Sequence, residues 1–423
     1  MSFNTISVVG LGYIGLPTAA MFASCKKTVI GVDVNQKAVD IINQGKIHIV
    51  EPGLEGIVSA AVKEGYFKAT TKPEPADAFL IAVPTPFKKS DSVIPEPDLS
   101  YIKAAVEAIA PVLKKGDLVI LESTSPVGAT EQMAEWLAAA RPDLSFPSFT
   151  SEAMTDFDVN IAHCPERVLP GHVVEELISN DRVIGGVSEA CSARAVELYK
   201  TFVEGECVVT NARTAEMAKL TENSCRDVQI AFANELSIIC DKLDINVWEL
   251  ISLANRHPRI NILQPGPGVG GHCIAVDPWF IISKSPDEAK IIHTARQVND
   301  AKPSWVIDKV KIAISDFLQA NPTKRIEDVT VACYGLAFKP DIDDLRESPA
   351  LNIAKQLAEL HSGTVLAVEP NIASLPESEV ALCLTTFEDA KGNADIHLML
   401  VDHKEFKQTI IESDYLIDTK GIW

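Results

Sequence analysis

The feature that most constrains the fold is a glycine motif near the N-terminus, GLGYIG at residues 10–15. It follows an apolar strand pattern at residues 5–10 and opens a helix pattern at residues 16–24. In this context the glycines let the backbone approach a pyrophosphate, and the helix N-terminus attracts its charge. Asp33 ends the next strand pattern, where a carboxylate accepts hydrogen bonds from an adenosine ribose and repels a 2′-phosphate. The motif therefore predicts a domain that binds NAD in preference to NADP; the alternative is a glycine turn without a cofactor.

Strand and helix patterns alternate in two blocks of the chain. Apolar strand patterns lie at residues 5–10, 28–34, 78–84, 118–123, 329–334, 364–368, 397–401 and 415–418, and helix patterns at 16–24, 101–113, 131–140 and 350–360. Residues 214–243, 248–254 and 287–319 between the blocks have helical patterns only. Alternation of this kind indicates βαβ units with parallel sheets. We therefore expect an α/β fold with two Rossmann-like parallel-sheet domains joined by a central helical domain, divided as residues 1–206, 207–320 and 321–423.

Composition excludes several classes of function. The formal net charge is −20, from 38 Lys and Arg against 58 Asp and Glu, which argues against nucleic-acid and anionic-membrane binding. No apolar run reaches the ~20 residues of a membrane span, and the N-terminus lacks the pattern of a secretion signal. Nine scattered cysteines include no CxxC pair, and nine histidines show no metal-binding spacing. We expect a soluble, cytoplasmic protein with reduced thiols and no metal site.

Two further loops leave the C-terminal ends of strand patterns, where open α/β sheets bind ligands. Thr85 lies in the first, residues 83–86, and Thr124 in the second, residues 122–128. Both threonines are candidate cofactor contacts, or else they satisfy local backbone groups. Ser125 followed by Pro126 matches the N-cap and first residue of a helix, and so does Ser348 followed by Pro349.

Polar residues of the central region form the next candidates. Lys219, Asn223 and Arg226 are spaced i, i+4, i+7 and share one helix face. They indicate a polar pocket, or else a solvated face on which Glu216 and Glu222 pair with the cations.

A glycine- and proline-rich loop, QPGPGVGGHC at residues 264–273, ends in a cysteine. Cys273 has little side-chain cover and is a candidate nucleophile toward an aldehyde, or else a structural cysteine. Further on, Lys339 and Arg346 follow a strand pattern and are candidate phosphate ligands. The alternative for these two cations is ion pairing with nearby aspartates, which are Asp341, Asp343 and Asp344.

Taken together, these motifs resemble those of the UDP-glucose/GDP-mannose dehydrogenases over essentially the whole chain. The matching segments are GLGYIGLP, VPTP, STSPVG, CPERVLPG, AEMAKLTEN, GPGVGGHCIAVDP and GLAFKPDIDDLRES. The resemblance implies an NAD-binding N-terminal domain, a helical dimerisation domain and a nucleotide-sugar-binding C-terminal domain. It also implies a four-electron oxidation of a sugar C6 alcohol with two NAD, through a thiohemiacetal and a thioester on Cys273, to make surface-polysaccharide precursors.

The resemblance also assigns roles to individual residues. Catalytic roles fall on Cys273, Lys219, Asn223, Asp277 and Glu166. Cofactor contacts fall on Gly10, Gly12, Tyr13, Ile14, Gly15, Asp33, Thr85, Thr124 and Arg346, the last of them toward the cofactor of a neighbouring chain. The UDP-sugar site falls on Arg167, Val168, Lys219, Asn223, Arg226, His257, Arg259, Gly270, Phe338, Lys339 and Lys420. The implied partners are the UDP-sugar and further copies of the chain in a homodimer or higher homo-oligomer.

Three departures from the family pattern bear on the sugar. Cys164 stands where members acting on UDP-glucose commonly have asparagine, Val276 where they commonly have lysine, and His272 where they usually have serine. These favour a UDP-linked 2-acetamido sugar, with other UDP-sugars, including UDP-glucose, as alternatives. Two other classes stay open: a two-electron β-hydroxyacid dehydrogenase, which would lack the cysteine loop, and a non-catalytic NAD-sensing protein.

Overall fold

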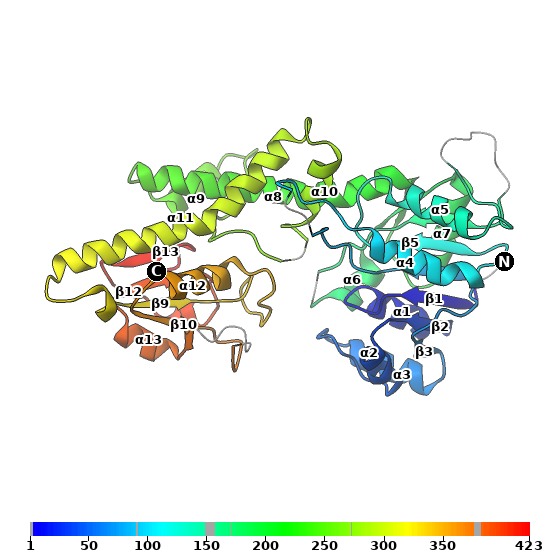
Figure 1. The fold of residues 1–423 in the computed structure, drawn as a ribbon, viewed down its shortest axis with the longest axis horizontal. Coiled ribbons are helices and arrows are strands. Elements are labelled where there is room, and N and C mark those ends of the chain that lie inside the picture. The colour runs from blue at the N-terminus through cyan, green and yellow to red at the C-terminus, as the bar shows by residue number, and fades with distance from the viewer. Residues whose placement is uncertain (1–2, 90–91, 149–156, 170, 272, 376–381) are drawn as a thin grey trace. The chain divides into compact units, whose positions relative to one another are not determined.

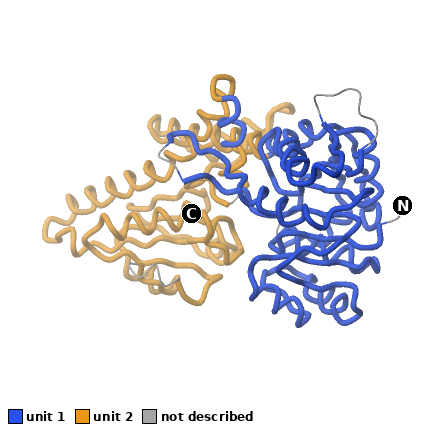
Figure 2. Tube along the Cα trace, turned by 45° about the vertical axis from the view of Figure 1, so that its right-hand side comes forward, with its two compact units in different colours: residues 1–222, 279–285 blue, residues 223–278, 286–423 orange. Residues whose placement is uncertain are grey.

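The computed structural model describes residues 3–89, 92–148, 157–169, 171–271, 273–375 and 382–423, so His272 lies outside it. The chain divides into two compact units (Figure 2). Unit 1 comprises residues 1–222 and 279–285, and unit 2 comprises residues 223–278 and 286–423. None of the helices in the described ranges is long and apolar enough to cross a membrane.

Unit 1 is built on an eight-stranded sheet in the order β3-β2-β1-β4-β5-β6-β7-β8 (Figure 1). Its strands are β1 (Thr5–Val9), β2 (Thr28–Val32), β3 (Phe67–Thr70), β4 (Ala78–Ile81), β5 (Leu118–Leu121), β6 (Asn160–His163), β7 (Arg182–Gly186) and β8 (Cys207–Asn211). Neighbouring strands are parallel except β6 and β7, which pair antiparallel. β4 and β5 are buried at every residue because helices cover both faces of the sheet.

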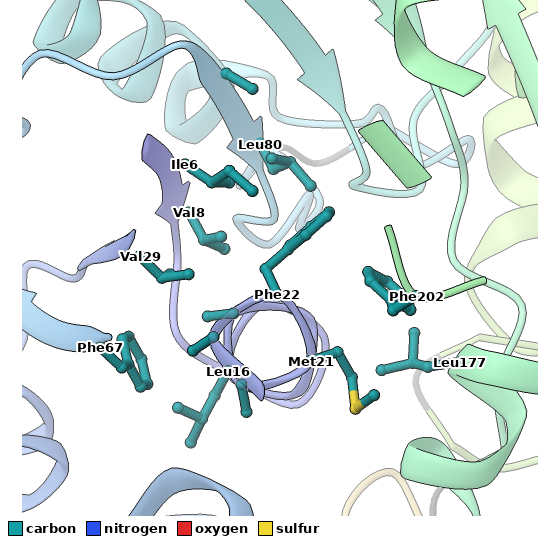
Figure 3. Packing of buried hydrophobic residues seen from close by; sticks show 14 of the residues in the cluster. Ile6, Val8, Leu16, Met21, Phe22, Val29, Phe67, Leu80, Leu177 and Phe202 are labelled. Carbon is teal, nitrogen blue, oxygen red and sulfur yellow. The ribbon is translucent and has the colours of Figure 1, made fainter. Parts of the chain in front are cut away.

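The helices of unit 1 form two layers. They are α1 (Gly15–Ser24), α2 (Gln36–Asn43), α3 (Leu54–Lys63), α4 (Ser100–Ile109), η1 (Ala110–Val112), α5 (Ala129–Ala140), α6 (Val173–Ser179) and α7 (Glu189–Tyr199). Side chains of α1, α3, α6 and α7 fill the core on one face, and those of α4 and α5 fill it on the other. In Figure 3, Phe22 and Met21 project from α1 into the first of these cores. The Phe22 and Phe202 rings meet edge to face at 4.8 Å between centroids.

Unit 2 contains a five-stranded parallel sheet in the order β11-β10-β9-β12-β13. Its strands are β9 (Thr330–Tyr334), β10 (Thr364–Val368), β11 (Cys383–Leu384), β12 (Ile396–Met399) and β13 (Leu416–Asp418). Its helices are α9 (Val247–Ala254), α11 (Lys290–Ala320), η2 (Ile326–Asp328), α12 (Pro349–Leu360), α13 (Phe387–Asn393) and η4 (Phe406–Gln408). α11 and α12 cover one face of the sheet, and α13 packs against the other. Two helices cross the division between the units: α8 (Ala212–Lys242) and α10 (Asp277–Lys284).

The α/β prediction is confirmed: each strand and helix pattern named from the sequence coincides with an element of that type, with ends that differ by a few residues. Several other elements were not identified from the sequence. β8 is an example, because its residues alternate only weakly and are mostly exposed at the sheet edge.

Candidate active site

The glycine turn of unit 1 has the close packing that its glycines predict. Gly10 has a φ of +92°, and its N–H donates to the Val32 carbonyl at 2.8 Å. A Cβ at Gly10 would lie 2.6 Å from the Ala82 oxygen, and one at Gly15 would lie 1.8 Å from the Gly10 oxygen. At Gly12, by contrast, no described atom lies within 4 Å of such a Cβ. The backbone is therefore open at Gly12, as an approaching pyrophosphate requires.

Asp33 lies beside this turn, directly after β2. Its Oδ2 accepts the Leu11 N–H at 2.9 Å, and its Oδ1 accepts the Asn35 N–H at 2.8 Å. The half-buried carboxylate is thus fixed to the glycine turn itself. This is the position from which a carboxylate binds an adenosine ribose in a Rossmann fold.

The loops after β4 and β5 adjoin the turn, since β1, β4 and β5 are neighbours in the sheet. The Ser123 hydroxyl donates to the Val83 carbonyl at 2.6 Å and joins the two loops. Thr85 Oγ1 is buried and has no hydrogen-bond partner among the described residues. Thr124 is half-buried on the second loop. An unsatisfied hydroxyl, an open backbone and a ribose-binding carboxylate together fit NAD.

Glu166 follows β6 and is only 6% exposed. Its Oε2 accepts the Val168 N–H at 2.6 Å. Arg167 forms an ion pair with Glu222 at 2.7 Å. Glu222 therefore pairs with Arg167, and not with a cation of its own helix as the solvated-face alternative supposed.

Near Glu166 lies a cluster of buried ionisable side chains that was not predicted from the sequence. The Tyr199 hydroxyl donates to Glu122 Oε1 at 2.6 Å, and Arg182 NH1 lies 3.9 Å from the same oxygen. Arg182 NH1 also lies 3.7 Å from Cys164 Sγ. Burial raises the pKa of Glu122 to about 7, although Arg182 and Tyr199 favour its ionised form. Only the apolar surroundings of Glu122 in the strand pattern could have indicated its burial.

In unit 2, the cysteine loop leads directly into α10. Cys273 is exposed, and its carbonyl accepts the Asp277 N–H at 2.9 Å, so one helical turn separates the two residues. Asp277 is 3% exposed, and its Oδ2 accepts a hydrogen bond from Asn223 Nδ2 at 2.6 Å. The structure thus brings Asn223 against Asp277, which lies 54 residues later in the sequence and one helical turn after Cys273.

The glycines of this loop pack against the C-terminal sheet region. A Cβ at Gly270 would lie 2.5 Å from the Glu347 carbonyl oxygen, and one at Gly271 would lie 3.3 Å from the Phe338 ring. The Lys420 ammonium lies 3.9 Å from the Cβ position of Gly266. The loop, Phe338 and Lys420 therefore form one region of unit 2.

The remaining cations of unit 2 differ in their surroundings. Lys339 is half-buried beside Phe338, whereas Arg226, His257 and Arg259 are exposed. Arg346 forms a two-pronged ion pair with Asp344, with NH2 to Oδ2 at 2.6 Å and Nε to Oδ1 at 2.9 Å. The ion-pair alternative for Arg346 is therefore realised within this chain.

The candidate residues are divided between the two units (Figure 2). Unit 1 holds the cofactor candidates other than Arg346, together with Glu166, Arg167, Val168 and Lys219. Unit 2 holds Asn223, Arg226, His257, Arg259, Gly270, Cys273, Asp277, Phe338, Lys339, Arg346 and Lys420. Because α8 carries both Lys219 and Asn223, it contributes candidates to each unit.

A glycine turn with a carboxylate at the ribose position of a Rossmann fold, and an exposed cysteine on a loop against a second parallel sheet, are features expected of an NAD-dependent dehydrogenase. Comparison of the sequence with family models agrees. The NAD-binding, central and UDP-binding domain models of the UDP-glucose/GDP-mannose dehydrogenase family match residues 4–203, 213–301 and 332–423. The chain belongs to this family, and its cofactor is NAD.

Particular relatives are similar over their full length. The UDP-N-acetyl-D-mannosamine dehydrogenase of Yersinia pestis is 66% identical, with 100% of both chains covered. The NDP-N-acetyl-D-galactosaminuronic acid dehydrogenase of Ralstonia nicotianae is 60% identical, covering 100% of this chain and 97% of the relative. Among solved structures, the UDP-D-ManNAc dehydrogenase of Pyrococcus horikoshii has a TM-score of 0.84 at 36% identity, covering 99% of this chain and 96% of that one.

Proposed function

We propose that the chain oxidises the C6 alcohol of UDP-N-acetyl-D-mannosamine to the carboxylate of UDP-N-acetyl-D-mannosaminuronate, a precursor of surface polysaccharide. The observation that carries this proposal is the 66% identity, over the full length, to the Yersinia pestis enzyme of that name. The reaction consumes one water and two NAD per sugar and releases two NADH and three protons. We further propose that the functional regions are residues 1–206, 207–320 and 321–423, and that the reaction takes place in the cytoplasm.

In the proposed mechanism, bound NAD supplies the hydride acceptor for both oxidations. Asp277, or a water beside Asp277 and Lys219, takes the proton of the C6 hydroxyl as the aldehyde forms. The Cys273 thiolate then adds to the aldehyde carbon and gives a thiohemiacetal. A second oxidation at that carbon leaves a thioester on Cys273.

The thioester is released by water, which attacks its carbonyl carbon while Glu166 or Asp277 takes the proton. The carboxylate leaves, and the thiol of Cys273 is restored. Lys219 and Asn223 would stabilise the oxyanions that form at the sugar C6, as preorganised donors do. The hydrogen bond between Asn223 and Asp277 supports this assignment because it holds the amide beside the carboxylate that follows Cys273 by one helical turn.

We assign binding of the UDP-sugar to the cationic and polar groups named from the resemblance. Lys339, Lys420 and Arg259 offer positive charge to the diphosphate despite the net charge of −20. His257 and Arg226 offer polar groups to the acetamido and hydroxyl substituents. His257 and Arg226 are exposed in the chain alone, so they would be buried only once bound sugar covers them. A polar group that the wrong sugar covers and leaves unpaired then costs ~1–3 kcal/mol, which gives roughly ten- to hundredfold discrimination.

An assay of NADH release over a panel of UDP-sugars tests the proposal. We expect UDP-N-acetyl-D-mannosamine to exceed UDP-glucose at least ~10-fold in kcat/KM, with two NADH per sugar. The panel includes UDP-N-acetylgalactosamine, because the Ralstonia relative acts in that series by its name. Equal or better turnover of UDP-glucose or UDP-N-acetylglucosamine would overturn the sugar assignment, and one NADH per sugar would overturn the four-electron reaction.

We also propose that the chain works as a homodimer or a higher homo-oligomer. In support, α8 exposes Cys225, Phe232 and Ile239 at intervals of seven residues, which places them on one stripe of the helix. Phe232 is 54% exposed and Ile239 is 44% exposed. Apolar side chains in such a stripe favour burial against a second copy of the same helix.

A further inference from the structure

In unit 2, a series of buried polar side chains, joined by hydrogen bonds, connects two long helices to the cysteine loop. Its residues are Asp227 and Asn234 on α8 and Arg296 and Asn299 on α11, each at most 2% exposed. Buried polar groups of this kind are costly unless every partner is present. Their place in the fold therefore calls for a functional explanation.

From the loop to Asp227, each group of the series donates a hydrogen bond to the next. The Gly266 N–H donates to Asn234 Oδ1 at 2.9 Å, and Asn234 Nδ2 donates to Asn299 Oδ1 at 2.9 Å. Asn299 Nδ2 then donates to Asp227 Oδ1 at 2.8 Å. Arg296 NH1 donates to the same carboxylate oxygen at 2.6 Å.

The group at each end of this hydrogen-bonded series has a fixed role as donor or acceptor. A backbone N–H can only donate, and a carboxylate paired with a guanidinium can only accept. Asn234 must therefore present its oxygen to Gly266, and Asn299 must present its oxygen to Asn234. Only one orientation of the Asn234 and Asn299 side-chain amides satisfies all of these hydrogen bonds. The ion pair of Asp227 and Arg296 therefore determines that the Gly266 N–H meets the oxygen of Asn234 and not its nitrogen.

The loop is held at successive points by the same part of the molecule. Gly266 is buried, and seven residues separate it from Cys273. Between them, a Cβ at Gly268 would meet Pro303 of α11 at 3.2 Å and Pro349 at 2.9 Å. Residues 266–268 are therefore closely held by α8, α11 and Pro349.

We propose that Asn234, oriented by Asn299, Asp227 and Arg296, is a positioning residue that sets the place of the Cys273 loop. The inference rests on the proposed role of Cys273 as nucleophile. None of these side chains would touch the substrate. Their effect would pass through the backbone of Gly266, and a misplacement of about 1 Å at a reacting atom can cost ~100-fold in rate.

The first test is alkylation of the thiols by iodoacetamide, resolved by residue with mass spectrometry. Cys383 is also exposed, so it serves as a reference within the same chain, and the buried Cys240 and Cys333 report unfolding. In Asn234→Ala we expect the labelling rate of Cys273 relative to Cys383 to change at least ~3-fold, with Cys240 and Cys333 still protected. An unchanged ratio in Asn234→Ala and in the milder Asn299→Ser would overturn the proposal.

The matched control is Ser237→Ala. Ser237 lies on the same buried face of α8, where its hydroxyl accepts a hydrogen bond from Lys302 of α11 and donates to the backbone carbonyl of Asn234 at 2.6 Å. Among the described residues, no hydrogen bond joins the Ser237 side chain to the loop. We expect Ser237→Ala to lower the Tm without changing the labelling ratio or kcat. We expect Asn234→Ala to lower kcat at least ~10-fold, with a smaller change in the KM for NAD. Equal kcat effects in the two variants would mean that Asn234 has only a structural role.

A double-mutant cycle separates action through Asn234 from independent effects. If Asn299 acts by orienting Asn234, Asn299→Ala should add little to the loss of kcat in Asn234→Ala. Additive losses would contradict this order of action. A changed labelling ratio with unchanged kcat would instead contradict the role proposed for Cys273, so failure of the two proposals can be distinguished.

Discussion

At the scale of single residues, we propose that Asp33 determines which cofactor the glycine turn accepts. Its carboxylate is fixed by the Leu11 and Asn35 N–H groups at the end of β2, which is where a Rossmann fold places its ribose-binding carboxylate. We expect kcat/KM to be much higher with NAD than with NADP. Asp33→Ser removes the repulsion of the 2′-phosphate and should lower the ratio of kcat/KM with NAD to that with NADP at least ~10-fold. Asp40→Ser, on the exposed face of α2, is the control. Comparable use of both cofactors by the unaltered chain would contradict the assignment.

Cys273 carries the covalent steps of the proposed mechanism. In Cys273→Ser the hydroxyl is a much poorer nucleophile, so we expect kcat to fall by more than ~10³-fold. Mass spectrometry should detect an aldehyde-level or covalent species that accumulates when the reaction stalls. Cys383→Ser removes another exposed thiol and should retain full activity. Near-normal turnover in Cys273→Ser would remove this cysteine from the mechanism.

At the scale of elements, Glu122 couples the stability of unit 1 to pH. Its pKa is raised from 4.5 to about 7 by burial between β5, β7 and α7. A carboxyl with a higher pKa in the folded chain holds its proton there. Its contribution to stability is complete below the pKa of the unfolded chain and is lost as the pH rises through about 7.

We therefore expect Glu122→Gln to flatten the pH dependence of unfolding. Between pH 5 and 8 the free energy of unfolding should shift in favour of the variant by up to roughly 3 kcal/mol. Urea denaturation at the two pH values measures this shift. Glu175→Gln, on the exposed side of α6, should show no such change. No difference between the two pH values would mean that Arg182 keeps Glu122 ionised throughout this range.

The first residues of the helices show which structural features can be predicted from the sequence and which cannot. The pair Ser348 and Pro349 was predicted to begin a helix, and α12 begins there with the Ser348 hydroxyl accepting the Leu351 N–H at 3.2 Å. This cap is local, because the capped N–H lies three residues after Ser348. The same hydroxyl also donates to the Leu336 carbonyl at 2.7 Å, a contact that the local pattern does not predict. Local patterns of this kind, and the apolar strands, can be read from the chain alone.

The same prediction at Ser125 was wrong, because α5 begins at Ala129 after Gly128. The Ser125 hydroxyl instead donates to the Ser123 carbonyl at 2.8 Å. The first N–H groups of α5 are bonded by Glu216 of α8, at 2.7 Å to Gly128 and 2.8 Å to Thr130. A partner 88 residues away in the sequence supplies the cap, and local reasoning cannot find it.

The candidate site follows the same division between local and distant partners. The glycine turn and its aspartate could be predicted because the motif itself contains the chemistry. The contact of Asn223 with Asp277 and the loop contact of Asn234 join segments far apart in the chain. The only signal in the sequence was polar residues at buried helical spacings, such as Asp227 and Asn234 seven positions apart.

At the scale of the whole molecule, the sheets of the two units share one strand order but differ at the position where a Rossmann fold binds ribose. The order β3-β2-β1-β4-β5 in unit 1 recurs as β11-β10-β9-β12-β13 in unit 2. Glu369, after β10, is the counterpart of Asp33 and accepts the Leu336 N–H at 2.7 Å. Unlike Asp33, it is only 4% exposed, and His403 Nε2 lies 2.9 Å from its Oε2. The carboxylate of the second sheet is therefore closed to a ribose, which agrees with NAD binding in unit 1 alone.

The proposed assembly makes a quantitative prediction about mixed dimers. Arg259 is exposed and precedes the cysteine loop, and we propose that Arg259 of the partner subunit completes each active site. Arg259→Ala and Cys273→Ala chains should then each be inactive alone. In a hybrid dimer, however, one site combines an intact cysteine with an intact arginine. Co-expression with two different tags isolates the hybrid, which should have about half the activity of the unaltered dimer. A hybrid of Arg259→Ala with the Arg259→Ala, Cys273→Ala double variant is the control and should be inactive. An inactive first hybrid would place Arg259 in the site of its own chain, and a monomer by light scattering at assay concentration would rule out the dimer itself.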